Sequence, residues 1–170
     1  MVKIIVAIAS NNGIGKNNDL LWHLPADMKF FTQTTTDHIV IMGRKNWDSI
    51  PHKFSPLPNR INAVVTKNME YTNDKADVFT SVEEAIAFYQ TEEYADKEIF
   101  IIGGGQIYKY SLENDLVDEM LVTMVDAEYE ADTFFPDIDE EKWDGELIME
   151  YEADEKNPHD FDIYRFVKKN

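Results

Sequence analysis

Short apolar segments recur along the chain and constrain its fold more than any other feature. Eight of them have the length and composition of strands, at residues 2–9, 39–43, 61–66, 77–80, 98–102, 116–125, 146–153 and 160–167. Amphipathic segments alternate with the earlier ones, whereas the last three follow one another without a strong helical pattern. This alternation predicts an α/β sheet covered on both faces, with antiparallel strands at one end.

Local signals predict three helices. Pro25 suits the first position of a helix. Ser81 followed by Glu84 forms a capping box, which opens a helix through Tyr89. Residues 105–112 follow a glycine run at the end of a strand and form the third helix.

A long loop, residues 10–23, joins the first strand to the first helix. It is rich in Asn and Gly, including Asn18. Because long loops in compact domains are often functional, we expect this one to act as a lid.

The composition excludes several classes of protein. A length of 170 residues fits a single domain covering residues 1–170. No apolar run is long enough to span a membrane, and no signal peptide fits the N-terminus. Cysteine is absent, which excludes disulfides and fits a reducing cytoplasm. The four histidines are scattered and predict no metal site.

The net charge of −17 argues against nucleic acid and anionic membranes as partners, but it is unevenly spread. Residues 1–70 carry eight Lys or Arg and five Asp or Glu, whereas residues 113–162 carry two and twenty. We therefore expect an anionic small ligand to bind the first half. The acidic half is interpreted as a solvated surface.

Asp27 is the first candidate for chemistry. On a helix it lies beside the rings of Phe30 and Phe31, which are three and four residues further along. Burial raises the pKa of a carboxyl group, and such a group can hold a flat ring that offers two N–H donors. The alternative is an aspartate in the first helical turn that faces water and complements the helix dipole.

Two further segments predict an anion site. Gly103-Gly104-Gly105 lies at a strand end that opens a helix, where backbone N–H groups can approach a phosphate. Gly43-Arg44-Lys45 follows another buried strand and places two cations at a similar junction. Arg60 follows a Pro-stiffened turn and can pair with a carboxylate. The alternatives are a plain tight turn at the glycines, two solvated cations at Arg44 and Lys45, and an Arg60 that simply caps its own turn.

In their order and separation, these segments resemble dihydrofolate reductase over nearly the whole chain. The matching segments are Ala7-Ile8-Ala9, Ile14-Gly15, Trp22-His23-Leu24-Pro25-Ala26-Asp27, Ile41-Met42-Gly43-Arg44, Trp47, Ser49-Ile50-Pro51, Pro56-Leu57-Pro58-Asn59-Arg60, Ile101-Ile102-Gly103-Gly104-Gly105, Ile107-Tyr108 and Asp132-Thr133-Phe134-Phe135-Pro136.

The resemblance implies one α/β domain with an eight-stranded, mostly parallel mixed sheet and flanking helices, including a fourth helix near 44–50. It implies an NADPH-dependent oxidoreductase acting on CH–NH bonds. The enzyme would reduce 7,8-dihydrofolate to 5,6,7,8-tetrahydrofolate by hydride transfer to C6 and protonation of N5. The chain would then be a cytoplasmic monomer of folate and one-carbon metabolism, and a target of antifolates.

The resemblance also implies site residues. The catalytic residues would be Asp27, Leu20 and Trp22. The substrate would be bound by Ile5, Ala7, Asp27, Phe31, Ile50, Leu57, Arg60, Ile102 and Thr123, with Arg60 on the α-carboxylate of the glutamate tail. The cofactor would be bound by Ala7, Ile14, Gly15, Gly43, Arg44, Lys45, Asn46, Thr66, Lys67, Ile102, Gly103, Gly104, Gly105, Gln106, Ile107 and Tyr108. A cis peptide would join Gly103 to Gly104.

The chain departs from the family pattern at several positions near the cofactor and the lid. Asn46 stands where Thr is common, and Lys67 stands where a small hydroxyl residue is frequent. A cation at position 67 favours NADPH. Leu20 stands where Met is frequent in the lid, and Ala131 stands where Gly is frequent. Pro158 replaces a loop residue that can hydrogen-bond the lid in some members.

Two other functions fit parts of the pattern. A reductase of the riboflavin pathway shares the fold and the use of NADPH but would not be expected to carry Asp27, Phe31 and Arg60 together. A catalytically inert folate- or nucleotide-binding module is the second, and the intact Asp27 and phosphate-binding set argue against it.

Overall fold

The computed structural model describes residues 1–17 and 19–170, so Asn18 of the predicted lid lies outside the described residues. Along the described residues the elements are, in order, β1 (Val2–Ile8), β2 (Gly13–Gly15), α1 (Pro25–Thr35), β3 (Ile39–Gly43), α2 (Arg44–Ser49), η1 (His52–Phe54), β4 (Ile61–Val65), β5 (Asp77–Phe79), α3 (Val82–Tyr89), η2 (Glu92–Tyr94), β6 (Ile99–Gly103), α4 (Gly105–Glu113), β7 (Glu119–Val125), β8 (Thr133–Phe134), β9 (Trp143–Tyr151) and β10 (Phe161–Lys168).

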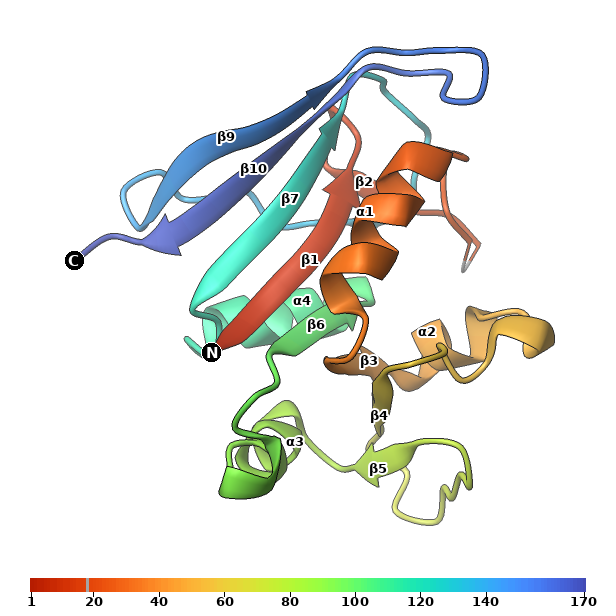
Figure 1. Ribbon diagram of the computed structural model, residues 1–170, viewed down its shortest axis with the longest axis vertical. Coiled ribbons are helices and arrows are strands. Elements are labelled where there is room, and N and C mark those ends of the chain that lie inside the picture. The colour runs from red at the N-terminus through yellow and green to blue at the C-terminus, as the bar shows by residue number, and fades with distance from the viewer. Residues whose placement is uncertain (18) are drawn as a thin grey trace.

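Eight strands form one sheet in the order β5-β4-β3-β6-β1-β7-β10-β9 (Figure 1). Neighbouring strands from β5 to β7 run parallel, and β10 runs antiparallel to both β7 and β9. The predicted α/β fold with an eight-stranded, mostly parallel mixed sheet is therefore confirmed, as is its antiparallel end.

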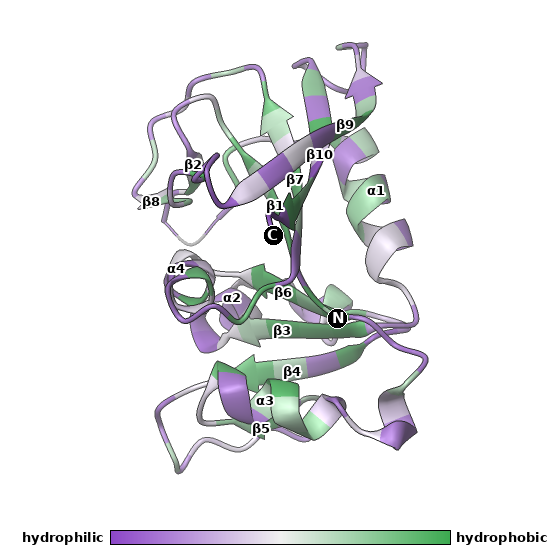
Figure 2. Cartoon of the chain, turned by 90° about the vertical axis from the view of Figure 1, so that its left-hand side faces the viewer, coloured by the Kyte–Doolittle hydropathy of each residue, from purple (hydrophilic) through white to green (hydrophobic). Residues whose placement is uncertain are grey.

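Both faces of the parallel part of the sheet are covered. In β1, Ile4 packs in a cluster that includes side chains of α3 and α4, while the next residue, Ile5, packs with Phe30 and Phe31 of α1. Figure 2 shows α1 and α4 on opposite sides of the apolar strands, and Trp47 of α2 packs in the cluster on the α1 face. This two-sided burial explains why these strands are continuous apolar runs in the sequence.

The predicted helix signals are largely confirmed. Helix α1 begins at Pro25, and α2 lies close to the expected 44–50. The Ser81 hydroxyl accepts a hydrogen bond from the Glu84 N–H at 3.0 Å, which caps α3 as expected. The Glu84 carboxylate, however, accepts from the N–H and the hydroxyl of Thr80 rather than closing the second half of a capping box.

Two features of the sequence-based prediction were wrong. The loop 10–23 contains strand β2, which pairs with β8 in a separate two-stranded sheet. These strands are too short for a periodic pattern, and their pairing depends on contacts more than 100 residues apart in sequence. The strand predicted at 116–125 begins only at Glu119, and the one predicted at 146–153 begins at Trp143.

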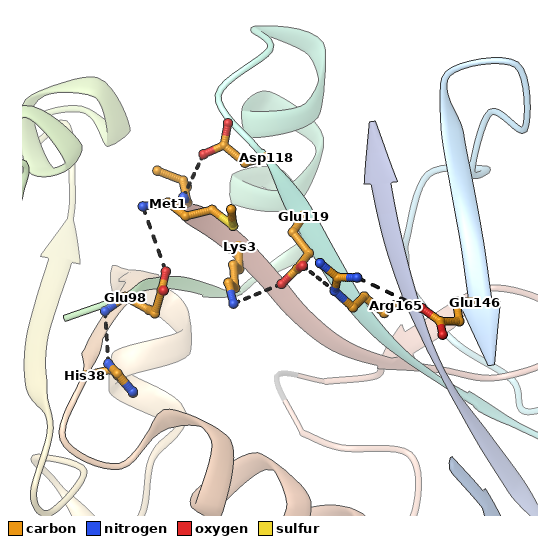
Figure 3. Close-up of polar contacts among 9 residues, drawn as sticks. Met1, Lys3, His38, Glu98, Asp118, Glu119, Glu146 and Arg165 are labelled. Carbon is orange, nitrogen blue, oxygen red and sulfur yellow. Dashed lines mark hydrogen bonds and ion pairs between the residues drawn. The ribbon is translucent and has the colours of Figure 1, made fainter. Parts of the chain in front are cut away.

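A row of charged side chains crosses the sheet at the end where β1 begins (Figure 3). The Glu119 carboxylate, 3% exposed, pairs with Lys3 at 3.0 Å and also accepts a hydrogen bond from the Arg165 guanidinium. Arg165 is in turn 4.0 Å from Glu146. These pairs tie β1, β7, β10 and β9 together, away from the carboxyl ends of the parallel strands.

Candidate active site

Asp27 lies in the first turn of α1 and is partly buried. Its Oδ1 atom accepts a hydrogen bond from the Thr123 hydroxyl at 2.7 Å, and Thr123 is 3% exposed in β7. Burial raises the pKa of the Asp27 carboxyl above its usual range, while the bond from Thr123 opposes that rise. The alternative of a fully solvated helix-start aspartate is therefore wrong.

Most of the apolar side chains predicted to line the substrate site belong to one cluster. Ile5 is buried in it together with Leu121 of β7, and the partly buried members packed on this core include Phe31, Ile50, Leu57 and Ile102. Ala7 pairs with Thr123 in the β1–β7 ladder, which places it beside the Asp27 contact. The structure thus brings the carboxylate and its apolar surroundings to the α1 face of the sheet.

Arg60 lies at the edge of this apolar cluster. Its guanidinium is 5.8 Å from the centre of the Phe31 ring and donates to the Thr35 hydroxyl at 3.2 Å and to the Pro58 carbonyl at 3.0 Å. Burial lowers the pKa of Arg60. Among the described residues no carboxylate pairs with it, so its remaining N–H donors can receive an external anion.

Asn62 fixes the turn that presents Arg60. It is 5% exposed, and its side chain bonds both the N–H and the carbonyl of Leu57 and the carbonyl of Arg60, each at 3.0 Å. This role could not be predicted from the sequence, because an asparagine inside a strand pattern does not indicate which loop its side chain contacts.

The two glycine segments meet at the carboxyl ends of the neighbouring strands β3 and β6, where Met42 pairs with Gly103. This is the edge at which parallel α/β sheets bind ligands. The Gly103–Gly104 peptide is cis, as the resemblance implied, and Gly103 has φ +125°. The Asn46 amide donates to the Ile102 carbonyl at 3.3 Å and so lies beside this turn.

The glycines differ in the space around them. A Cβ atom at Gly104 would meet no atom within 4 Å, so this backbone borders an opening. A Cβ at Gly105 would lie 2.6 Å from Thr133 and 3.7 Å from Ile14, and one at Gly43 would lie 3.0 Å from Ile107. Gly104 thus faces open space, whereas Gly105 and Gly43 permit close packing of neighbouring segments.

Tyr108 of α4 contacts the carboxyl-end edge of the sheet through its buried side chain. Its hydroxyl donates to the Ile5 carbonyl at 2.9 Å, and burial raises its pKa. The same hydroxyl lies close to Gly103, since a Cβ atom added there would be 3.4 Å from it. The buried tyrosine therefore links β1 to the turn after β6.

The predicted phosphate-binding cations have different surroundings. Arg44 begins α2, lies 4.4 Å from the centre of the Tyr71 ring and is 3.6 Å from the Asp48 carboxylate. Lys45 and Lys67 are exposed, as is Gln106 at the start of α4. Thr66 follows β4, and its hydroxyl accepts from the Asn68 N–H at 3.2 Å. Arg44 therefore has two side-chain contacts, whereas the two lysines are solvent-exposed.

The described part of the predicted lid is anchored at several points. Gly15 pairs with Thr133, the N–H of Asn17 donates to the Asp132 carboxylate at 2.9 Å, and Lys16 pairs with Glu130 at 2.7 Å. These bonds hold the loop against the segment before β8.

The two predicted catalytic residues of this loop are not joined to Asp27 by any hydrogen bond between described residues. Leu20 is 61% exposed. Trp22 meets Tyr129 edge to face at 5.6 Å between ring centroids and packs against the buried cluster that contains Leu24.

Sequence reasoning missed a group of residues around the loop 152–160. Asn157, which is 3% exposed, accepts from the Ala26 N–H at 2.9 Å, one residue before Asp27. The Tyr129 hydroxyl lies 2.5 Å from His159 Nε2. An Asn-Pro dipeptide indicates a turn but not its distant partner. No cluster of three or more His, Asp or Glu suited to a metal occurs within the described residues.

Comparisons with known proteins agree on one family. The family model described as dihydrofolate reductase matches residues 1–168. The dihydrofolate reductase of Bacillus subtilis (strain 168) is 38% identical over 173 aligned residues, which cover 100% of this chain and 96% of the relative. That of Haemophilus influenzae is 39% identical over 157 residues, which cover 92% of each chain.

A solved structure gives the same result. The dihydrofolate reductase of Enterococcus faecalis, complexed with NADP(H) and RAB-propyl, superposes with a TM-score of 0.88 at 32% identity, covering 100% of this chain and 97% of that one. With the Asp27–Thr123 pair and the two glycine turns in the expected places, these matches show that the chain belongs to the dihydrofolate reductase family.

Proposed function

We propose that this chain reduces 7,8-dihydrofolate to 5,6,7,8-tetrahydrofolate with NADPH and that Asp27 is the group that holds the pterin ring. Membership of the family supports the reaction and the cofactor. The observation that carries the residue assignment is the partly buried Asp27 carboxylate, bonded to Thr123 at 2.7 Å among apolar side chains.

Asp27 suits a flat ring with adjacent N–H donors. One of its oxygens accepts from Thr123, and the carboxylate keeps further acceptor sites for a ring nitrogen and an amino group. Its raised pKa moves its titration toward neutral pH, where a carboxyl group can take part in delivering a proton to N5. Ile5 and Phe31 exclude water on the same face.

The other substrate and cofactor residues extend this arrangement. Arg60 would receive the α-carboxylate of the glutamate tail, because a planar guanidinium matches that group. The open backbone at Gly104 and the fixed cation Arg44 fit the cofactor phosphates. When bound, NADPH supplies the hydride transferred to C6. Leu20 and Trp22 would close the site from the loop 10–23, and the remaining implied residues would line it.

We also propose the setting in which the enzyme works. Residues 1–170 form one domain that acts as a cytoplasmic monomer without nucleic-acid or membrane partners. The net charge of −17 supports the absence of anionic partners, and the lack of cysteine fits a reducing compartment. Within the described residues, no helix has the length and apolar character needed to cross a membrane.

The proposed reaction is tested by following the near-ultraviolet absorbance of NADPH in the presence of dihydrofolate. We expect a loss of absorbance that requires both dihydrofolate and the protein and that methotrexate inhibits. The methotrexate arm separates this activity from that of a riboflavin-pathway reductase. Absence of any dihydrofolate-dependent loss would contradict the proposal.

A further inference from the structure

The first turn of α1 has no cap of its own. Leu24 occupies the N-cap position and offers no side-chain acceptor, and Pro25 at the next position has no N–H. Ala26 therefore supplies the first free backbone donor of the helix, and Asp27 follows it directly. A helix start without a local acceptor needs a partner from elsewhere in the chain.

Asn157 supplies that partner from 131 residues away in sequence. Its Oδ1 atom accepts from the Ala26 N–H at 2.9 Å, and the residue is 3% exposed. Because no other acceptor among the described residues bonds this N–H, losing the bond would leave the Ala26 donor without a protein partner.

Asp154 determines which way the Asn157 amide points. The Asn157 Nδ2 donates to Asp154 Oδ1 at 2.9 Å, and an ionised carboxylate can only accept. The amide nitrogen must therefore face Asp154, which leaves the amide oxygen for Ala26.

Two hydrogen bonds donated by backbone N–H groups close the same turn. The Asp154 N–H donates to the Asn157 carbonyl at 2.9 Å, and the Asn157 N–H donates to Asp154 Oδ1 at 2.8 Å. Hydrogen bonds from Asn157, Tyr151 and backbone N–H groups lower the pKa of Asp154 to about 2, so its charge persists at neutral pH.

The turn formed by Asp154 and Asn157 also contacts the apolar cluster on which α1 packs. The Tyr151 hydroxyl donates to Asp154 at 2.8 Å, and the Tyr151 ring stacks on Phe161 with centroids 4.9 Å apart. Phe161 is buried in the cluster that contains Leu24, the residue at which α1 begins. The helix start and the loop 152–160 thus rest on the same apolar cluster.

We propose that Asn157 is a positioning residue for Asp27. Its amide oxygen fixes the first turn of α1, Asp154 fixes the amide, and together they hold the Asp27 carboxylate against Thr123. The inference rests on the proposed function for its catalytic consequence, but the placement of Asp27 can be measured without substrate. Without the bond, the first turn frays and water reaches the carboxylate.

Two variants test this role. Asn157→Ala removes the acceptor, and Asp154→Asn removes the charge that orients the amide. Matched controls are Asn114→Ala, which removes an exposed asparagine bonded to the Tyr110 carbonyl in α4, and Glu155→Gln, which makes the same charge change in the same loop.

The first measurement follows the titration of Asp27 in the ligand-free protein by NMR of its side-chain carboxyl carbon. We expect both test variants to move the midpoint down toward the usual aspartate value, because the carboxyl gains water, and both controls to leave it unchanged. An unchanged midpoint in both test variants would overturn the inference, whatever the wild-type protein does with dihydrofolate. If Asn157→Ala does not fold, the Asp27 titration midpoint of Asp154→Asn alone tests the inference.

The second measurement separates the positioning role from general damage. We expect turnover of dihydrofolate to fall about tenfold in Asn157→Ala, because small displacements of a catalytic group are costly, while NADPH affinity changes by less than about twofold. A parallel loss of NADPH affinity would contradict positioning of Asp27 alone. A wild-type protein without activity would refute the proposed function and leave the titration result standing.

Discussion

The Thr123 hydroxyl donates a 2.7 Å hydrogen bond to the Asp27 carboxylate and so joins the first turn of α1 to the middle of β7. Thr123 is almost fully buried, and its strand is flanked by β1 and β10. The carboxylate is therefore held by a buried side chain of an interior strand of the sheet. This placement combines burial, which disfavours its charge, with a hydrogen bond that favours it.

The burial of Asp27 predicts that the site reduces stability at neutral pH. Because the folded-state pKa is raised, the folded protein binds more protons than the unfolded chain between the unfolded and folded pKa values. Stability therefore falls as pH rises through the folded pKa and stays lower above it. We expect Asp27→Asn to raise the free energy of unfolding at neutral pH, with the gain shrinking as pH is lowered.

Urea unfolding of the ligand-free protein across the acid-to-neutral range measures this difference. Asp74→Asn is the control, since Asp74 is exposed and its side chain has no hydrogen bond or ion pair among the described residues. A stability gain that is the same at every pH would show that burial of the charge is not its cause.

Substitutions at the adjacent residues Gly104 and Gly105 should have different effects on cofactor binding and on stability. Gly104→Ala places a methyl group where no atom lies within 4 Å, so we expect a change in stability of at most about 0.5 kcal/mol together with weaker NADPH binding. Gly105→Ala places a methyl group 2.6 Å from Thr133 and should cost about 1–3 kcal/mol of stability through overpacking. Thermal unfolding and fluorescence titration with NADPH check both. Full NADPH affinity in Gly104→Ala would exclude the opening as the phosphate site.

Two arginines should act on different ligands. Arg60→Leu is expected to weaken dihydrofolate binding by about 10–100-fold, because it removes hydrogen bonds to a charged group, and to affect NADPH little. Arg44→Leu is expected to show the opposite preference. Titration of each variant with each ligand measures the pattern, and equal weakening of both ligands by Arg60→Leu would count against the tail-carboxylate assignment.

The parts of the fold with strong local signals could be predicted from the sequence. Apolar runs such as Ile39–Gly43 and the start signals at Pro25 and Ser81 lie where expected. The short pairing of Gly13 with Phe134 could not be predicted, because neither segment has a periodic pattern and their contact depends on the folded chain.

The candidate site also contains residues that a local motif predicts and residues that no local motif predicts. Motif residues such as Asp27 and Gly103–Gly105 were predicted as site residues from their order in the chain, and the structure describes where they lie. Asn157, Tyr129 and Asn62 were not, because each acts through a contact with a distant backbone or side-chain group that no local pattern records. The cation–π contact of Arg44 with Tyr71 was missed for the same reason.

The central claim, that Asp27 holds and helps protonate the pterin, is tested most directly by the rate of dihydrofolate reduction by Asp27→Asn across pH. An amide keeps the shape but cannot act as an acid, so we expect turnover at neutral pH to fall by about 100-fold or more. The loss should be much smaller at acid pH, where the substrate can arrive already protonated. A loss of the same size at every pH would contradict this role for Asp27.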